Sequence, residues 1–325
     1  MTDVVVLGWD GLDLELVEQF GLGEAFGSYR TTIDTHVNPI VDEPHTLELW
    51  PSMITGLPPD EHGVVAVTES EGVEWGNPVL DVASTVGNQV LPHEIMIYLG
   101  AKVRELGAGP DITKASYYRE RDIETVFESC GGHAISIPNY QTDADRAHGL
   151  DAHRDRLWQA LDVSYAGEGT TPGVAVPQIY DELGAAVGRR LGHTLMAIDG
   201  GEPLVWTWFG LLDSVGHMEP AVGDQLVADW YRTAAQITRQ VRAQAPADTA
   251  VLAVSDHGIQ EGEHTHYATL CADDPTPVEE IGHVFGIADW LRSQEFERGA
   301  TERQISDAGR ETVRETLADM GYIES

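Results

Sequence analysis

Three short apolar runs, each followed within a few residues by an aspartate, constrain the fold of this chain most strongly. They cover residues 4–7, 204–212 and 250–254. Continuous apolar runs of this length, bounded by turn residues, are typical of strands buried on both faces of a sheet. Stretches with helical spacing lie between them, among them residues 179–195 and 224–244. Strands that alternate with helices predict an α/β fold, a three-layer α/β/α sandwich with a mostly parallel central sheet.

Apolar spacing and capping residues predict further elements. A helix should begin near Thr46, because threonine is a good N-cap and apolar residues follow it at helical spacing. It should end at Gly56, which is followed within a few residues by two prolines. The other predicted elements are helices over residues 12–20 and about 302–320, and strands over residues 64–67 and 134–137.

Residues 68–175 are the least regular part of the chain and are rich in glycine, proline, asparagine and tyrosine. They form either a cap that covers a pocket or a set of long surface loops. We favour the cap, because long loops within compact domains are usually functional. No repeat or low-complexity linker divides the chain, so residues 1–325 are expected to form one domain that carries this stretch as an insertion.

Acidic residues and histidines follow the three apolar runs. The aspartates are Asp10, Asp213 and Asp256, and the nearby histidines are His217, His257, His264 and His266. Ligands usually gather at the carboxyl ends of strands in an open α/β sheet, so these side chains should meet at one edge. An aspartate after a strand is often only a helix cap, and a lone histidine is usually structural. Their joint occurrence favours a site for a pair of divalent cations, which carboxylates and neutral imidazoles bind well.

Three segments resemble the alkaline phosphatase superfamily. Residues 44–63 resemble its nucleophile segment, in which a Thr or Ser begins a helix nine residues before a Thr-Gly and a His-Gly follows; Thr46 and Thr55 have this separation. Residues 213–217 resemble its Asp-Ser-x-Gly-His segment, and residues 255–258 its Ser-Asp-His-Gly segment. The segments occur in the order of the family. The resemblance is closest to the type I phosphodiesterase/nucleotide pyrophosphatase branch, and it implies an alkaline phosphatase-like catalytic domain.

The resemblance also implies two metal sites and a nucleophile. One site would use Asp10, Thr46, Asp256 and His257, and the other would use Asp213, His217 and a later histidine. We favour His264 as this last ligand, because Ala268 takes the place four residues later where the family has Gly or Pro. His266 remains the alternative. Two Zn²⁺ ions are expected, with Mn²⁺ or Fe as alternatives that suit the same ligands.

Thr46 is the expected nucleophile of a phosphoryl transfer through a covalent phospho-threonine. A threonine hydroxyl is a weak nucleophile that metal coordination activates, and a helix N-terminus favours a phosphoryl anion.

Threonine is typical of the diesterase branch, and the chain lacks the Cys/Ser-x-Pro-x-Arg pattern of sulfatases. The expected function is therefore that of a phosphodiesterase. The alternatives are a phosphomonoesterase, a phosphomutase or a metal-binding relative without turnover. Two residues depart from the family pattern. Val67 stands where nucleotide pyrophosphatases carry an Asn that donates a hydrogen bond to the transferred group, and a valine side chain cannot donate. Glu48, in the first turn of the helix that begins at Thr46, is either a surface carboxylate favoured by the helix dipole or a group that repels an anionic substrate.

The negative charge of the chain argues against some classes of binding partner. It has 54 acidic and 19 basic residues, a formal net charge of −35, and only two lysines. Such a surface repels nucleic acid and anionic lipid, so we expect a small phosphate ester as substrate. Dispersed carboxylates with few lysines resemble the surfaces of proteins from halophilic archaea.

The N-terminal residues read as a core strand and not a signal peptide, and residues 204–212 are too few to cross a bilayer, so a cytoplasmic protein is expected. The oligomeric state is left open.

Overall fold

The computed structural model describes residues 2–39, 42–65, 113–148, 164–165, 170–171 and 175–296. The predicted helix at 302–320 and Val67 lie outside these residues. So does most of the stretch 68–175, and with it the question of a cap. Within that stretch, residues 113–148 contribute three short helices and one strand of the central sheet, and residues 164–165 pair with residues 170–171.

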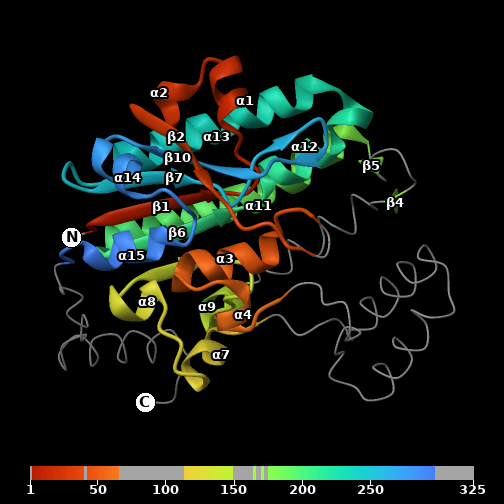
Figure 1. Ribbon diagram of the computed structural model, residues 1–325. Helices are drawn as coiled ribbons and strands as arrows, with labels where there is room; N and C mark the ends of the chain where they lie inside the picture. The colour runs from red at the N-terminus through yellow and green to blue at the C-terminus, as the bar shows by residue number, and fades with distance from the viewer. Residues whose placement is uncertain are drawn as a thin grey trace, which may run out of the picture.

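A six-stranded, mostly parallel sheet forms the centre of the protein (Figure 1). Its strand order is β2-β10-β7-β1-β6-β3, and only β10 runs antiparallel to its neighbours. The predicted α/β fold with a mostly parallel sheet is confirmed. The strands of this sheet are β1 (Val4–Trp9), β2 (Tyr29–Asp34), β3 (His133–Ile135), β6 (Leu204–Phe209), β7 (Ala250–Val254) and β10 (Tyr267–Ala272).

Helices cover both faces of the sheet, which makes three layers (Figure 1). Alternate residues of β1 enter different cores: Val5 and Leu7 pack on one face, and Val4 and Val6 on the other. The first core includes residues of α1 (Leu14–Gln19), α2 (Gly23–Phe26), α11 (Val176–Gly200), α12 (Leu211–Val222) and α13 (Asp224–Gln244). The second includes residues of α3 (Thr46–Thr55), α7 (Ala115–Glu120), α8 (Val126–Ser129) and α15 (Gly286–Ser293).

Shorter elements complete the described chain. The helices are α4 (Pro59–His62), α9 (Asp143–His148) and α14 (Pro275–Glu280). Two small antiparallel pairs are formed by β4 (Ser164–Tyr165) with β5 (Thr170–Thr171), and by β8 (Ile259–Gln260) with β9 (Glu263–His264). Among the described residues, no helix is both long and apolar enough to cross a membrane.

Several predicted bounds need correction. The apolar run 204–212 is not one strand: β6 ends at Phe209, and α12 begins at Leu211, so Asp213 lies in the first turn of a helix. The N-cap of α3 is His45 and not Thr46, because His45 has extended backbone angles and its Nδ1 accepts the amide hydrogen of Leu47 at 3.3 Å. Residues 64–65 do not form a strand, and the rest of that predicted strand lies outside the described residues.

Two glycines allow the close packing that places the site. A Cβ at Gly8 would lie 2.6 Å from the ring of Trp50, so glycine lets α3 pack directly on β1. Gly11 has φ +75°, and a Cβ there would lie 2.7 Å from the backbone of Asp213. The loop after β1 therefore passes against the first turn of α12, which brings Asp10 and Asp213 to the same place.

Candidate metal centre

The carboxyl ends of β1, β6 and β7 lie level with one another at the centre of the sheet. Trp9 is in register with Phe209, and Gly8 with Val254. Asp10 follows β1 directly, Asp213 follows β6 by way of α12, and Asp256 lies two residues after β7. The β8–β9 hairpin then returns to the same edge and carries His264. Two clusters of donor atoms result, each with all atoms within 4.8 Å of one another.

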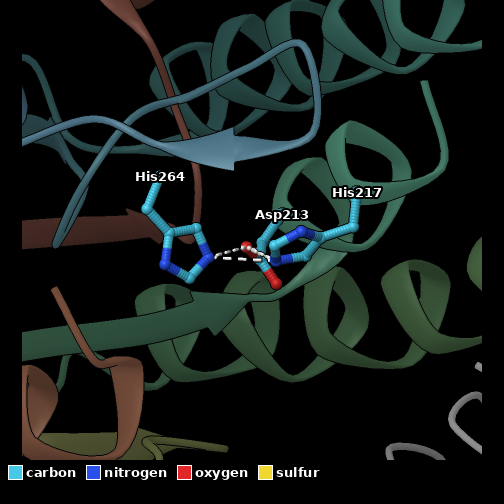
Figure 2. Close-up of side chains that lie close together, drawn as sticks. All are labelled: Asp213, His217 and His264. Carbon is cyan, nitrogen blue, oxygen red and sulfur yellow. Dashed lines mark hydrogen bonds and ion pairs between the residues drawn. The ribbon is translucent and has the colours of Figure 1, made fainter. Parts of the chain in front are cut away.

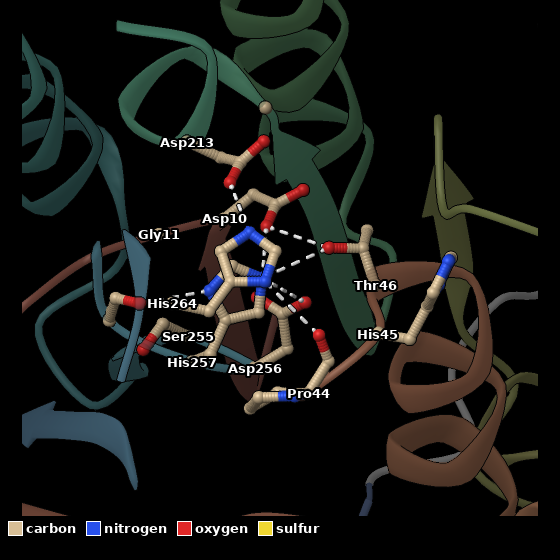
Figure 3. A network of polar contacts seen from close by, with 12 residues as sticks. Asp10, Gly11, Pro44, His45, Thr46, Asp213, Ser255, Asp256, His257 and His264 are labelled. Carbon is tan, nitrogen blue, oxygen red and sulfur yellow. Dashed lines mark hydrogen bonds and ion pairs between the residues drawn. The ribbon is translucent and has the colours of Figure 1, made fainter. Parts of the chain in front are cut away.

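The first cluster consists of Asp10, Asp256 and His257, with Thr46 beside it (Figure 3). His257 Nε2 lies 3.4 Å from both Asp10 Oδ1 and Asp256 Oδ2. Thr46 Oγ1 donates to Asp10 Oδ1 at 3.2 Å and lies 3.1 Å from His257 Nε2. The three ligand-type side chains are buried, whereas Thr46 is half-buried. Thr46 is thus the most exposed residue of this group.

The second cluster consists of Asp213, His217 and His264 (Figure 2). Asp213 and His217 are four residues apart on α12, so they share one face of the helix. Asp213 Oδ1 lies 3.2 Å from His217 Nε2 and 3.3 Å from His264 Nε2. The two imidazole Nε2 atoms are 2.9 Å apart. Three donor atoms on two elements therefore converge on one point.

Backbone carbonyls determine which nitrogen of each histidine faces the clusters. Nδ1 of His217 lies 3.0 Å from the carbonyl oxygen of Gly262, and Nδ1 of His264 lies 3.2 Å from that of Pro44. Nδ1 of His257 lies 3.1 Å from the carbonyl oxygen of Gly258. A carbonyl only accepts hydrogen bonds, so in each neutral ring Nδ1 carries the hydrogen and Nε2 keeps its lone pair. This outer arrangement is typical of metal-binding histidines.

The electrostatics of the clusters favour the binding of a cation. Burial, together with the nearby carboxylates of Asp256 and Asp213, raises the pKa of Asp10 well above its ordinary value. Burial also acts to raise the pKa of Asp213, but His217 and His264 outweigh it and hold that pKa well below its ordinary value. Neither carboxylate oxygen of Asp256 has a hydrogen-bond partner among the described residues.

Buried carboxylates of this kind are costly unless a cation balances them. Both clusters therefore fit a divalent cation by their donor types as well as by their geometry. The mixture of carboxylate oxygens and imidazole nitrogens suits Zn²⁺, and Mn²⁺ or Fe²⁺ would use the same ligands.

Helix α3 directs its N-terminus at the first cluster. Thr46 is its first residue, so the positive end of the helix dipole lies beside the Thr46 hydroxyl. The dipole favours an anion at that position. Pro51 lacks the amide that would bond to the carbonyl of Leu47, and the side-chain amide of Asn139 donates to that carbonyl instead, at 2.9 Å.

The structure brings the seven predicted site residues together: Asp10, Thr46, Asp213, His217, Asp256, His257 and His264. His266, the alternative to His264, is exposed and takes part in neither cluster. Sequence reasoning missed Trp208, whose Nε1 donates to Asp10 Oδ2 at 3.2 Å. No sequence signal marks this residue, because a tryptophan within an apolar run reads as core. It also missed Glu43, whose Oε2 lies 3.7 Å from His264 Nδ1.

Comparisons with known proteins give a distant likeness of fold. No protein-family model matches the chain, and no curated protein matches it. Murine ectonucleotide pyrophosphatase/phosphodiesterase 5 is 13% identical with a TM-score of 0.42, over 79% of this chain and 57% of that protein. The alkaline phosphatase of the Antarctic bacterium TAB5 is 14% identical with a TM-score of 0.41, over 89% of this chain and 96% of its own. PH0037 from Pyrococcus horikoshii is 12% identical with a TM-score of 0.43, over 91% and 98%. At these values the likeness assigns no reaction to this chain.

Proposed function

We propose that this protein is a two-metal-dependent phosphoryl hydrolase of the phosphodiesterase type, with Thr46 as its nucleophile. One observation carries the proposal. The Thr46 hydroxyl lies at the N-terminus of α3 and contacts both Asp10 and His257, at 3.2 and 3.1 Å, within a buried set of donors that fits a cation. Nucleophile, metal ligands and the N-terminus of a helix thus converge at one place, as a phosphoryl transfer requires.

Each side chain has a proposed role. Asp10, Thr46, Asp256 and His257 would hold one cation, and Asp213, His217 and His264 the other. When bound, two divalent cations would supply Lewis acidity to the oxygens of the substrate. We propose Zn²⁺ for both sites, with Mn²⁺ or Fe as alternatives.

The proposed hydrolysis proceeds in two steps, both of which use Thr46. Thr46 Oγ1, whose acidity a bound cation would increase, loses its proton to solvent water and attacks phosphorus. The P–O bond to the leaving group breaks, and the covalent product is phospho-threonine. The dipole of α3, whose N-terminus lies beside Thr46, stabilises the transferred anion. A water molecule then cleaves the Thr46–phosphorus ester and restores the hydroxyl.

Preference for a diester rests on the threonine nucleophile and on the resemblance of three segments to the phosphodiesterase branch. Phosphomonoesterase or phosphomutase activity would use the same residues, and a metal-binding relative would lack turnover. We further propose a single catalytic domain, a small phosphate ester as substrate, and a cytoplasmic, halophilic setting for a chain of formal net charge −35.

Hydrolysis of bis-p-nitrophenyl phosphate and p-nitrophenyl phosphate, in molar KCl with Zn²⁺ or Mn²⁺, tests the proposal. We expect faster cleavage of the diester. Thr46→Ala should lower kcat by about 10³-fold or more, because it removes the attacking oxygen. Thr46→Ser, which keeps a hydroxyl, should retain measurable turnover, and metal content should report that both variants keep an assembled site.

Each other outcome has a definite meaning. Faster cleavage of the monoester would contradict the diesterase branch and leave the nucleophile in place. Unchanged turnover in Thr46→Ala would contradict the nucleophile itself. If the metal-loaded, folded protein cleaved neither ester, the reading as a metal-binding relative without turnover would replace the enzyme.

A further inference from the structure

The carboxylate of Asp10 has two oxygens in different surroundings. Oδ1 faces the first cluster, 3.2 Å from Thr46 Oγ1 and 3.4 Å from His257 Nε2. Oδ2 points away from it and accepts a hydrogen bond from Trp208 Nε1 at 3.2 Å. In Asp256, by contrast, neither oxygen has a hydrogen-bond partner among the described residues. A hydrogen bond therefore fixes the orientation of the Asp10 carboxylate, whereas no hydrogen bond from a described residue fixes that of Asp256.

The Trp208 indole is itself held in place. It lies near the end of β6, the strand that runs beside β1, and only 7% of the residue is exposed. A Cβ at Gly210 would come within 2.4 Å of its ring, so glycine makes room for the indole there. The guanidinium of Arg190 lies over the ring, 5.2 Å from its centroid. The ring is thus fixed on two sides while its N–H reaches Asp10.

Trp208 differs in this respect from the other tryptophans of the described residues. The other five all bury Nε1 with no hydrogen-bond partner in the described part of the chain; they are Trp9, Trp50, Trp206, Trp230 and Trp290. Trp208 pairs its N–H, and it does so with a carboxylate of the candidate site. A purely space-filling role, which accounts for the other five, does not account for this contact.

We propose that Trp208 is a positioning residue of the metal centre: its indole N–H holds Oδ2 of Asp10, so that only Oδ1 faces the cation. An indole N–H donates but neither accepts nor binds a metal, so it occupies one carboxylate oxygen without competing for the ion. Such outer hydrogen bonds orient metal ligands, and their loss usually weakens metal binding. Asp10 then binds through one oxygen, and Asp256 is the carboxylate free to use both. The inference rests on the proposed function only in that a cation binds the first cluster.

Trp208→Phe tests the inference, because it keeps a ring and deletes the N–H. Trp206→Phe is the matched control: it makes the same change two residues earlier in β6, where the buried Nε1 has no described partner. Zn²⁺ affinity would be measured by competition with a chromogenic chelator. We expect about 10–100-fold weaker binding at one of two sites in Trp208→Phe, and wild-type affinity in Trp206→Phe.

Two further readouts separate positioning from stability. Visible absorption of the Co²⁺-loaded protein should change in Trp208→Phe, because Asp10 becomes free to bind through both oxygens, and should stay unchanged in Trp206→Phe. With bis-p-nitrophenyl phosphate, kcat should fall in Trp208→Phe while KM changes little. Equal Zn²⁺ affinity and equal Co²⁺ spectra in the two variants would overturn the role of Trp208 while leaving the proposed hydrolase intact. A wild-type protein that binds no metal would overturn both.

A measurement on the wild-type protein removes any dependence on how the variant folds. In protein labelled with ¹⁵N at its eight tryptophans, the indole N–H signal of Trp208 should shift when Zn²⁺ is added, because Trp208 is the one described tryptophan that donates to a proposed metal ligand; the Trp208→Phe variant assigns the signal. The absence of any responding indole signal at metal saturation would overturn the inference.

Discussion

At the scale of single residues, the candidate metal centre concentrates buried charge that the core otherwise avoids. Asp10, Asp213 and Asp256 are 2%, 8% and 0% exposed, and they gather at the ends of neighbouring strands. Repulsion among these carboxylates opposes folding unless cations offset it. Asp213 has two imidazoles beside it, whereas Asp10 and Asp256 share one, His257. The first cluster therefore needs external positive charge more than the second.

A histidine away from the centre gives a prediction about stability and pH. His62 is fully buried; its Nδ1 accepts the amide hydrogen of Val64 at 3.1 Å, and its Nε2 lies 2.9 Å from Ser52 Oγ. Burial lowers the pKa of His62 to about 4, below its value in the unfolded chain. The unfolded state therefore takes up the proton first as the pH falls. The contribution of neutral His62 is fully present above about pH 6.5 and is lost as the pH falls toward 4.

We expect the titration of His62 to lower the free energy of unfolding by about 2 kcal/mol when the pH falls from 7 to 5. Urea unfolding of the wild type and of His62→Gln at both pH values measures it. The glutamine variant should be less stable at pH 7 and should lose less stability on acidification. An identical loss in both proteins would show that His62 does not titrate in this way.

Individual residues also show how far sequence reasoning reaches. The aspartates and histidines of the centre could be predicted, because few other reasons place such groups together after apolar strands. Trp208 could not, because its contact with Asp10 depends on the register of β6 against β1 and on the room left at Gly210. The carbonyls of Pro44 and Gly262 belong to the backbone, which carries no residue-specific signal.

At the scale of elements, α3 is the part of the fold that the site depends on most. Its N-terminus presents Thr46, and its buried side packs against β1 at Gly8 through Trp50. Pro51 in its interior leaves the carbonyl of Leu47 without its usual helical partner, and Asn139 supplies the donor. Asn139 has φ +53°, a conformation that asparagine tolerates better than most residues. The loop after β3 is thereby hydrogen-bonded to the first turn of α3.

This arrangement predicts a coupling between Asn139 and Pro51. Asn139→Gly keeps the backbone conformation and removes the hydrogen bond, so it should lower the unfolding free energy by about 1 kcal/mol. In a Pro51→Ala background, the new amide can donate to the Leu47 carbonyl, and Asn139→Gly should then cost clearly less. A double-mutant cycle from urea unfolding measures the difference. Equal costs in the two backgrounds would show that Asn139 does not replace the amide missing at Pro51.

Elements with strong patterns were predicted well. The helix at 224–244 and the strand at 250–254 have the predicted bounds, because one has a sustained apolar stripe and the other is continuous in apolar residues. The antiparallel pair of β2 and β10 was not predicted, since β2 lies at an edge of the sheet and only Ile33 of its residues is buried. The end of β6 was misplaced because buried helix residues continue the apolar run of the strand.

At the scale of the whole molecule, the sheet gathers residues from distant parts of the chain into one centre. Asp10 and His264 are separated by most of the described chain, yet both lie at the carboxyl edge of the central strands. The formal net charge of the protein is −35, so it repels an anionic substrate. Bound cations and concentrated salt would both reduce this repulsion. We therefore predict that turnover depends on cations bound at the two clusters.

The most direct test of the account is the location of bound metal in crystals grown with Zn²⁺, by anomalous scattering at the zinc edge. We predict two peaks per chain. One should lie among Asp10, Thr46, Asp256 and His257, and the other among Asp213, His217 and His264, about 3.5–4 Å apart as in other two-metal sites. Asp256→Asn should lose the first peak preferentially. No peak in either cluster, or zinc bound only elsewhere on the protein, would contradict the two-metal hydrolase.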